Sequence, residues 1–370
     1  MLLSRRVAYI LGAGVNRSVH DLESVPPPVA GDFFPTLLNT QIGARIWSWG
    51  SSLAPYIARY WHKDQDALAQ DGLDLEELFT FLEYHRLRGA PEEMAEVVNA
   101  EFEAKSMFAQ YMAHFEDFAD ESLRQFARLL KRQAAGVLTF NYDCILERAM
   151  ESVSDSINHP DNASGFSVYS WNRSLAYGLH FDEIELKARI EPKWVGKDYY
   201  TTRALYEPPL LKLHGSVSWH RYLPVHSSLR GNATPPFPGH LAARLLLLHN
   251  RSPSRAPIFR NGWMLDPVLI TPALFKEQYY RQPVFQRLWA MAEATLRSCE
   301  DLVVVGYSFP PTDFNIRNLL RLVFGTHTLA SLTGVNPIDE AEGRAQALTS
   351  FAGHVDRYST LNDYVSAVHA

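Results

Sequence analysis

The chain has 370 residues, of which 46% are hydrophobic and 21% charged, an ordinary composition for a soluble globular protein with a large core. Its formal net charge of -6 argues against direct nucleic acid binding through a broadly basic surface. Two cysteines occur, Cys144 and Cys299, and neither has a CxxC neighbour, so we expect no zinc site, no disulfide framework and a reducing, cytoplasmic location.

The first predicted strand is Val7–Leu11, which leads directly into Gly12-Ala13-Gly14. The apolar run before Gly12 is too short for a signal peptide or a membrane span, so we expect no membrane association. A strand that ends in a glycine pair lets the pyrophosphate of a dinucleotide approach backbone N–H groups, because a Cβ at Gly12 or Gly14 would hold the phosphate away. A tight turn without a ligand remains the alternative, since the third glycine of the Rossmann fingerprint is missing.

Asp32 lies about 20 residues further on, where that fingerprint has an acid that binds ribose. No second strand leads into Asp32. The approach is instead a rigid, proline-rich loop over residues 26–31. The sequence therefore predicts a nucleotide site of a different design, with this loop folded over the ligand.

Residues 39–134 have the apolar periodicity of helices, and we interpret them as a helical insert between the first and second strands. An aromatic-rich stretch at its start is explained either by an oligomer contact or, more simply, by the core. The stretch Val137–Asp143 then reads as a buried strand with Asn141 and Asp143 at its tip, followed by an amphipathic helix. Ligands bind at the carboxyl ends of strands in an open α/β sheet, so an amide and a carboxylate at this place favour a binding site.

Two polar, irregular segments, residues 151–209 and 218–265, are predicted to be variable loop insertions. Between them a short strand from Leu210 ends in His214-Gly215. A histidine at a strand end is suited to acid–base chemistry, and Gly215 would let a ligand approach it. A lone histidine is more often structural, but a position beside Asn141 on a neighbouring strand would favour catalysis. The histidines of the second insertion lack metal-ligand spacing, so we expect no metal site; its arginines either contact a partner or form solvated surface.

The last part of the chain alternates strands and helices. We predict strands at 266–272, 302–305, 329–335 and 354–358, a helix over 315–324 capped by Thr312 or Asp313, a helix that begins at Pro283, and a closing helix over 361–368. Gly306 and Ser308 follow one strand, and Asn336 follows another. The alternation predicts an α/β fold with a Rossmann-like, doubly wound, mostly parallel sheet assembled from residues 1–38, 135–150, 210–217 and 266–370.

Taken in order, these motifs resemble a known family. Gly12-Ala13-Gly14, Thr139-Phe140-Asn141-Tyr142-Asp143, His214-Gly215, Gly306-Tyr307-Ser308 and Val335-Asn336 occur in the order of the NAD-binding motifs of sirtuins. The amino-acid sequences around three of them, TFNYD, LKLHGS and VVVGYSF, are similar to those of the prokaryotic sirtuin-like effectors of antiphage defence, which destroy NAD+. The resemblance covers the sheet and its tips, about half of the chain.

The resemblance implies NAD+ as the substrate and a role for each matching residue. Gly12, Ala13 and Gly14 would receive the pyrophosphate, Asn141 would orient the nicotinamide ribose and the attacking water, Asp143 would bind the carboxamide, His214 would be the base, Gly306 and Ser308 would contact phosphate or ribose, and Asn336 would contact the adenine-side ribose. Asn16 stands where sirtuins have a serine.

The chain departs from the family between His214 and Asp266, where no cysteine of the sirtuin zinc module occurs. The resemblance therefore favours an NAD+ hydrolase over an NAD-dependent protein deacylase or ADP-ribosyltransferase, with a non-catalytic nucleotide-binding scaffold as a third reading. Because unregulated cleavage of NAD+ would kill the host, we expect the activity to be gated. Gating would come from a homo-oligomer or from a separately encoded activator, such as a HerA-like ATPase or an Argonaute-like protein.

Overall fold

Two continuous apolar runs of the chain form adjacent strands at the centre of a parallel sheet. The computed structural model describes residues 6–48, 50–153, 171, 173–186, 192–197, 208–224, 245–248, 259–260, 263–274, 276–310, 312–336 and 350–369. In it, β1 (Val7–Leu11) pairs with β10 (Asp301–Val305), and only the first residue of each strand is not fully buried. Such burial on both faces is typical of a parallel sheet covered by helices.

This sheet has six strands, and all of its pairings are parallel. In spatial order they are β12 (Ala352–Tyr358), β11 (Leu329–Val335), β10, β1, β2 (Ala134–Thr139) and β5 (Leu210–Lys212). Ranked along the chain and read from β5 to β12, the strands follow the order 3-2-1-4-5-6, which is the Rossmann order. The predicted Rossmann-like α/β fold is therefore confirmed, as is the edge strand near the C-terminus.

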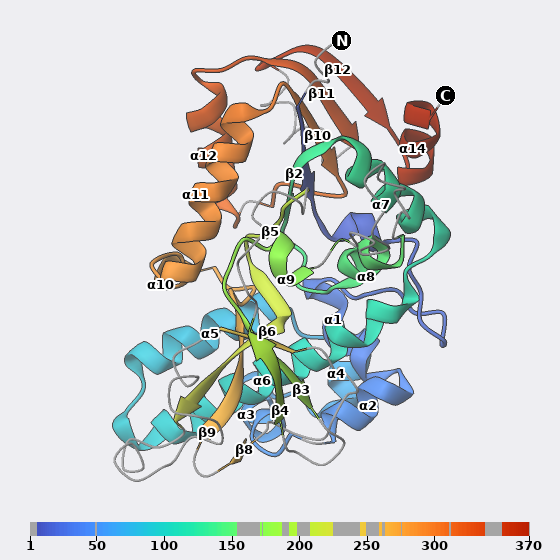
Figure 1. Ribbon diagram of the computed structural model, residues 1–370. Helices are drawn as coiled ribbons and strands as arrows, with labels where there is room; N and C mark the ends of the chain where they lie inside the picture. The colour runs from blue at the N-terminus through green and yellow to red at the C-terminus, as the bar shows by residue number, and fades with distance from the viewer. Residues whose placement is uncertain are drawn as a thin grey trace.

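Helices cover both faces of the parallel sheet (Figure 1). On one side lie α11 (Pro283–Ser298) and α12 (Phe314–Phe324). On the other lie α7 (Glu121–Gln133), α8 (Ile145–Ser152) and α14 (Leu361–His369). Pro283 opens α11 as predicted, because its missing N–H is not needed in a first turn.

A second six-stranded sheet corrects the prediction for the two insertions and for the segment from Asp266. Its strands, in spatial order, are β4 (Pro192–Lys197), β3 (Asp182–Leu186), β7 (Leu246–Leu248), β6 (Gly215–Pro224), β9 (Trp263–Leu269) and β8 (Phe259–Arg260). The described parts of both insertions therefore contain strands rather than loops alone. β9 pairs antiparallel with β6, so the strand around Asp266 does not belong to the parallel sheet.

Both faces of the first half of β6 are buried, one apolar with Val217 and Trp219 and the other polar. Ser216, Ser218 and His220 are buried, and the two serines hydrogen-bond to each other at 3.0 Å. Ser216 also lies 3.3 Å from the sulfur of Cys144. The alternation of polar and apolar residues that marks a strand is therefore present in β6, and the prediction of a loop insertion overlooked it.

The segment interpreted as a helical insert, residues 39–134, consists mainly of helices. They are α2 (Gln41–Trp47), α3 (Leu53–Trp61), α4 (Gln65–Asp71), α5 (Leu75–Arg88), α6 (Met94–His114) and α7, with short 3-10 turns η3 (Pro91–Glu93) and η4 (Phe115–Phe118). Asp64, Asp74 and Asp120 accept backbone N–H groups at the starts of α4, α5 and α7, which stabilises those ends. α6 packs on β6 and β9, whereas α7 packs on β2, so the segment contacts both sheets.

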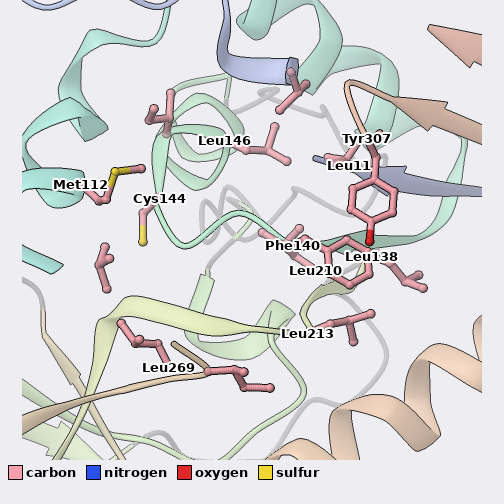
Figure 2. Close-up of a cluster of buried hydrophobic side chains, with 14 of the residues drawn as sticks. Leu11, Met112, Leu138, Phe140, Cys144, Leu146, Leu210, Leu213, Leu269 and Tyr307 are labelled. Atoms are coloured by element: carbon pink, nitrogen blue, oxygen red, sulfur yellow. The ribbon is translucent and has the colours of Figure 1, made fainter. Parts of the chain in front are cut away.

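Shorter elements complete the description: η1 (Ala13–Asn16), η2 (Ala30–Asp32), α1 (Phe33–Leu38), α9 (Arg173–Ala176) and α10 (Glu277–Tyr280). The apolar core runs under the strand ends, where Phe140 and Tyr307 lie close together (Figure 2). Within the described ranges, no helix has the length and apolar character needed to cross a membrane.

Candidate functional site

A cavity of about 280 Å³ opens at the carboxyl ends of the parallel strands. It lies next to β1 and β10, where the strand order reverses, and ligands of open α/β sheets bind at that switch point. Its wall is formed by Gly12, Ala13, Pro28, Val29, Ala30, Phe33, Leu75, Glu76, Phe108, Met112, Phe140, Asn141, Tyr142, Asp143, His214, Pro272, Lys276, Gly306, Tyr307, Ser308, Pro310, Thr312 and Asp313. The volume is near the lower end for small-molecule sites, which span roughly 300–1,000 Å³.

The glycine loop after β1 is locked to the loop after β10. Gly12 donates its N–H to Val305 O at 3.0 Å, and Gly14 donates to Gly306 O at 2.9 Å. A Cβ on Gly12 would stand 2.6 Å from Gly306 O. The glycines thus allow two loops to pack, and the N–H groups of Gly12 and Gly14 are already bonded within the protein. This corrects the reason predicted for the pair, which was close approach of a phosphate.

Asn141 joins the tips of β2 and β1. Its Nδ2 donates to Gly12 O at 3.1 Å, and its backbone N–H donates to Thr139 Oγ1 at 3.1 Å. The first bond holds the side-chain amide on the cavity wall, and the second holds the backbone that carries it. A fixed amide can orient a ligand hydroxyl or a water without first losing side-chain freedom.

Asp143 also reaches the cavity, but its two carboxylate oxygens already accept hydrogen bonds. Asn16 Nδ2 donates to Oδ2 at 2.9 Å, and the N–H of Ile145 at the start of α8 donates to Oδ1 at 3.0 Å. Burial raises the pKa of the Asp143 carboxyl. Asn16 therefore acts behind Asp143 rather than in the cavity.

A buried ion pair supports the tip of β2 from below. Lys212 donates from Nζ to the backbone carbonyl of Asp143 and to Glu147 Oε1, the latter at 2.8 Å. Tyr177 donates to the same Glu147 oxygen at 2.8 Å. Burial by itself would raise the pKa of Glu147, but the charges of Lys212 and Arg173 and the hydrogen bonds from Lys212 and Tyr177 together outweigh it and lower that pKa.

His214 follows β5, the neighbour of β2, so the predicted proximity to Asn141 is realised on one cavity wall. The imidazole is 4% exposed and meets the ring of Phe140 edge-on at 5.0 Å between centroids. Because burial disfavours the charged ring, the pKa of His214 falls to about 4. The ring is consequently neutral near pH 7 and can accept a proton.

Sequence reasoning missed an ionic cluster beside His214. Asp313 Oδ1 accepts from Lys276 Nζ at 2.6 Å, and Asp313 Oδ2 accepts from Tyr307 OH at 2.8 Å. Asp313 stands at the N-cap of α12, yet its side chain makes no capping bond there, which corrects that prediction. Asp313 was visible in sequence as a polar residue just after Gly306-Tyr307-Ser308, whereas Lys276, separated from it by 37 residues, gave no signal.

Several predicted ligand residues do not line the cavity: Gly14, Asn16, Asp32, Gly215 and Asn336. Asp32 instead accepts the N–H of Val29 at 2.7 Å and so fixes the loop whose residues Pro28 to Ala30 do line it. The backbone N–H of Asn336 donates to Tyr358 O at 3.0 Å.

Gly215 is needed where the chain leaves β5 of the first sheet and enters β6 of the second, not for the approach of a ligand. Its φ of +81° lies in the left-handed region, and a Cβ would stand 2.4 Å from Val268 O. The position therefore requires glycine because β9 packs directly against it.

No protein-family model matches the sequence, and no curated protein matches it. Among solved structures, the chain is similar to a Sir2 homologue in complex with NAD, with 12% identity, a TM-score of 0.42 and coverage of 99% of this chain and 88% of the other. It is also similar to a mutant Sir2 homologue in complex with ADP-ribose, with 13% identity, a TM-score of 0.41 and coverage of 99% and 92%. A structure on sirtuin substrate affinity gives 11% identity, a TM-score of 0.40 and coverage of 99% and 93%. Scores at this level carry no argument about function.

No group of histidine, cysteine, aspartate or glutamate side chains suited to a metal ion is found among the described residues.

Proposed function

We propose that the protein is an NAD+ hydrolase that cleaves NAD+ to nicotinamide and ADP-ribose. One observation carries the proposal: a cavity at the switch point of a Rossmann-ordered sheet is lined together by Gly12, Asn141, His214 and Ser308. These residues come from four different strand tips, and they are the ones that the resemblance to sirtuin motifs singles out.

The chemistry needs a fixed amide and a neutral base. The bond between the nicotinamide nitrogen and the ribose breaks with its electron pair going to nicotinamide, and the sugar passes through an oxocarbenium-like state. Water then attacks the anomeric carbon and loses a proton to His214. Asn141 orients the ribose and this water. Positioning of this kind can supply ~7–11 kcal/mol, and a general base commonly adds ~10²–10⁴-fold.

The charge of the cavity wall suits the cationic ring of NAD+. Glu76, Asp143 and Asp313 bring carboxylates to the wall, and the cation Lys276 is paired with Asp313. Opposite charge near the pyridinium favours its binding. The N–H groups of Gly12 and Gly14 are bonded within the protein. We therefore assign Ala13, in the glycine loop, and Ser308, after β10, to contacts with the phosphates and ribose.

Hydrolysis is preferred to protein deacylation because the chain lacks the cysteines of the sirtuin zinc module between His214 and Asp266. The test is an incubation of the purified protein with NAD+ alone and with NAD+ plus an acetylated peptide. We expect nicotinamide and ADP-ribose in equal amounts in both arms. Nicotinamide release that requires the peptide, or a modified peptide product, would replace hydrolysis with deacylation or ADP-ribosyl transfer.

We further propose that the enzyme is a gated, cytoplasmic effector of bacterial antiphage defence that depletes NAD+. The support is the motif resemblance and the danger of an ungated NADase to its host. Gating would come from homo-oligomer assembly or from a separately encoded HerA-like ATPase or Argonaute-like protein. Gel filtration with light scattering, combined with the NAD+ assay on each fraction, tests gating by assembly, and a stable, fully active monomer would contradict it.

A further inference from the structure

The Nε2 atom of His214 is buried, has no hydrogen-bond partner and faces a carboxylate. Asp313 Oδ1 lies 3.7 Å from this nitrogen, too far for a hydrogen bond but close enough for a direct ionic contact once the ring is charged. Asp313 and Lys276 are 5% and 8% exposed, so solvent screens the contact poorly.

We propose that Asp313 is the positioning residue of the catalytic histidine. Its carboxylate accepts a hydrogen bond from Nε2–H of His214 when Nδ1 removes the proton from water. In the resting protein the ion pair with Lys276 keeps the carboxylate away from the imidazole. This inference rests on the proposed function. In this step the proton from water moves to Nδ1, and the positive charge spreads over the imidazole ring. Nε2–H then donates a hydrogen bond to Oδ1, and Asp313 stays ionised. Because the neutral ring has no bond to Asp313, the interaction is gained only as charge develops, which is what accelerates a reaction.

The cluster around Asp313 is built to aim this carboxylate. Tyr307 holds Oδ2 at 2.8 Å and stacks on Phe140 with 4.5 Å between ring centroids. Phe140 in turn meets the imidazole edge-on. Phe140 therefore contacts both the imidazole and the tyrosine that holds the carboxylate.

The groups that face His214 come from three segments. Asp313 and Tyr307 lie between β10 and α12, Lys276 lies before α10, and Tyr142 lies after β2 with its ring 5.9 Å from the imidazole. Burial has the largest effect on the pKa of His214 and lowers it. The Asp313 charge opposes this lowering, whereas the Lys276 charge adds to it. Removing one or the other must therefore move this pKa in opposite directions.

The test is the NMR titration of the imidazole signals in the full chain, with the His214 signal identified by its loss in His214→Gln. In Lys276→Met we expect the pKa of His214 to move upward from about 4 towards its ordinary 6.5. In the double variant Lys276→Met/Asp313→Asn, which leaves no unpaired charge from this pair, the pKa should return to the wild-type value or below. Lys105→Met is the matched control, because it breaks a buried ion pair with Asp266 of 2.8 Å outside the cavity wall. It should leave the His214 signal where it is.

The kinetic arm uses nicotinamide release. Asp313→Asn should lower kcat by ~10-fold or more with KM changed much less, and Asp313→Glu should recover part of the loss. If Lys276→Met and the double variant give the same His214 titration, the positioning role is overturned even though NAD+ is hydrolysed. If the titrations differ as expected while no variant and no wild-type protein releases nicotinamide, the pairing stands and the proposed function fails.

Discussion

Asn141 donates its side-chain N–H to the backbone carbonyl of Gly12 across 3.1 Å, and this bond ties together the ends of the adjacent strands β2 and β1. It holds the amide on the cavity wall before any ligand arrives. The structure thus places the amide at the switch point of the sheet, beside the strand that carries His214.

Replacement of this amide should remove activity without unfolding the protein. In Asn141→Ala we expect NAD+ loss to fall at least ~100-fold, because the ribose and the attacking water lose their orienting group. NAD+ and nicotinamide are followed by chromatography, and the fold by thermal melting. Asn39→Ala is the control, since Asn39 bonds to the carbonyls of Pro35 and Ala69 at an exposed site. An Asn141→Ala protein as active as Asn39→Ala would remove Asn141 from the mechanism.

The pH profile should reveal a histidine that stays neutral in mildly acidic solution. Burial lowers the pKa of His214 to about 4, so the free enzyme keeps its base unprotonated from about pH 8 to about pH 6. We expect kcat/KM for nicotinamide release to be flat over that range and to fall only at lower pH. A histidine with the ordinary pKa of 6.5 would instead halve the rate near that pH. A half-maximal point near neutrality would contradict the buried, neutral base.

Gly306 should tolerate no side chain. It has a φ of +60°, and a Cβ would stand 2.3 Å from the N atom of Val15. We expect Gly306→Ala to cost roughly 2–5 kcal/mol of unfolding free energy through backbone strain and overpacking, measured by urea unfolding. Gly334→Ala, in β11 with nothing within 4 Å of its Cβ, should stay within about 1 kcal/mol of the wild type. Equal effects of the two changes would mean that the glycine loops are not packed as described.

The ion pair under the site should matter for stability, with a defined pH dependence. Glu147 and Lys212 are both buried, so Glu147→Gln leaves an unpaired ammonium and should cost about 3–5 kcal/mol. The pKa of Glu147 is lowered from 4.5, so the contribution is complete above that value and is lost as the pH falls through the lowered pKa. The stability gap between wild type and variant should therefore shrink in acid.

The control for this prediction is Glu121→Gln, which removes an exposed carboxylate that contacts Arg124 and Arg128. We expect no measurable change in its unfolding midpoint, since exposed ion pairs contribute little. A gap for Glu147→Gln that stays constant from neutral to acid pH would show that the Glu147 carboxylate is not the stabilising species.

The parallel sheet could be predicted because its central strands have a clear sequence pattern. Val7–Leu11 and Leu302–Val305 are continuous apolar runs, and such runs followed by glycines mark buried strands and their tips. Asn141 and His214 could be found because each follows a short, mostly apolar run.

The remainder of the site depends on long-range pairing that no local pattern encodes. The pairing of β6 with β9, which builds the second sheet and takes β9 away from the parallel one, joins segments that lie far apart in the sequence. Asp313 has the position of a helix cap, but its carboxylate instead accepts hydrogen bonds from Lys276 and Tyr307. The reason for Gly12 and Gly215 was likewise misjudged, because a glycine in sequence does not show which neighbour would meet its Cβ.

The most direct test of the central claim is the structure of His214→Ala soaked with NAD+, a variant that should bind the dinucleotide without cleaving it. We expect the nicotinamide ribose beside the Asn141 amide and the space left by the imidazole, with the pyrophosphate near Ala13 and Ser308. NAD+ bound elsewhere on the protein, or an empty cavity at a saturating concentration, would contradict the account.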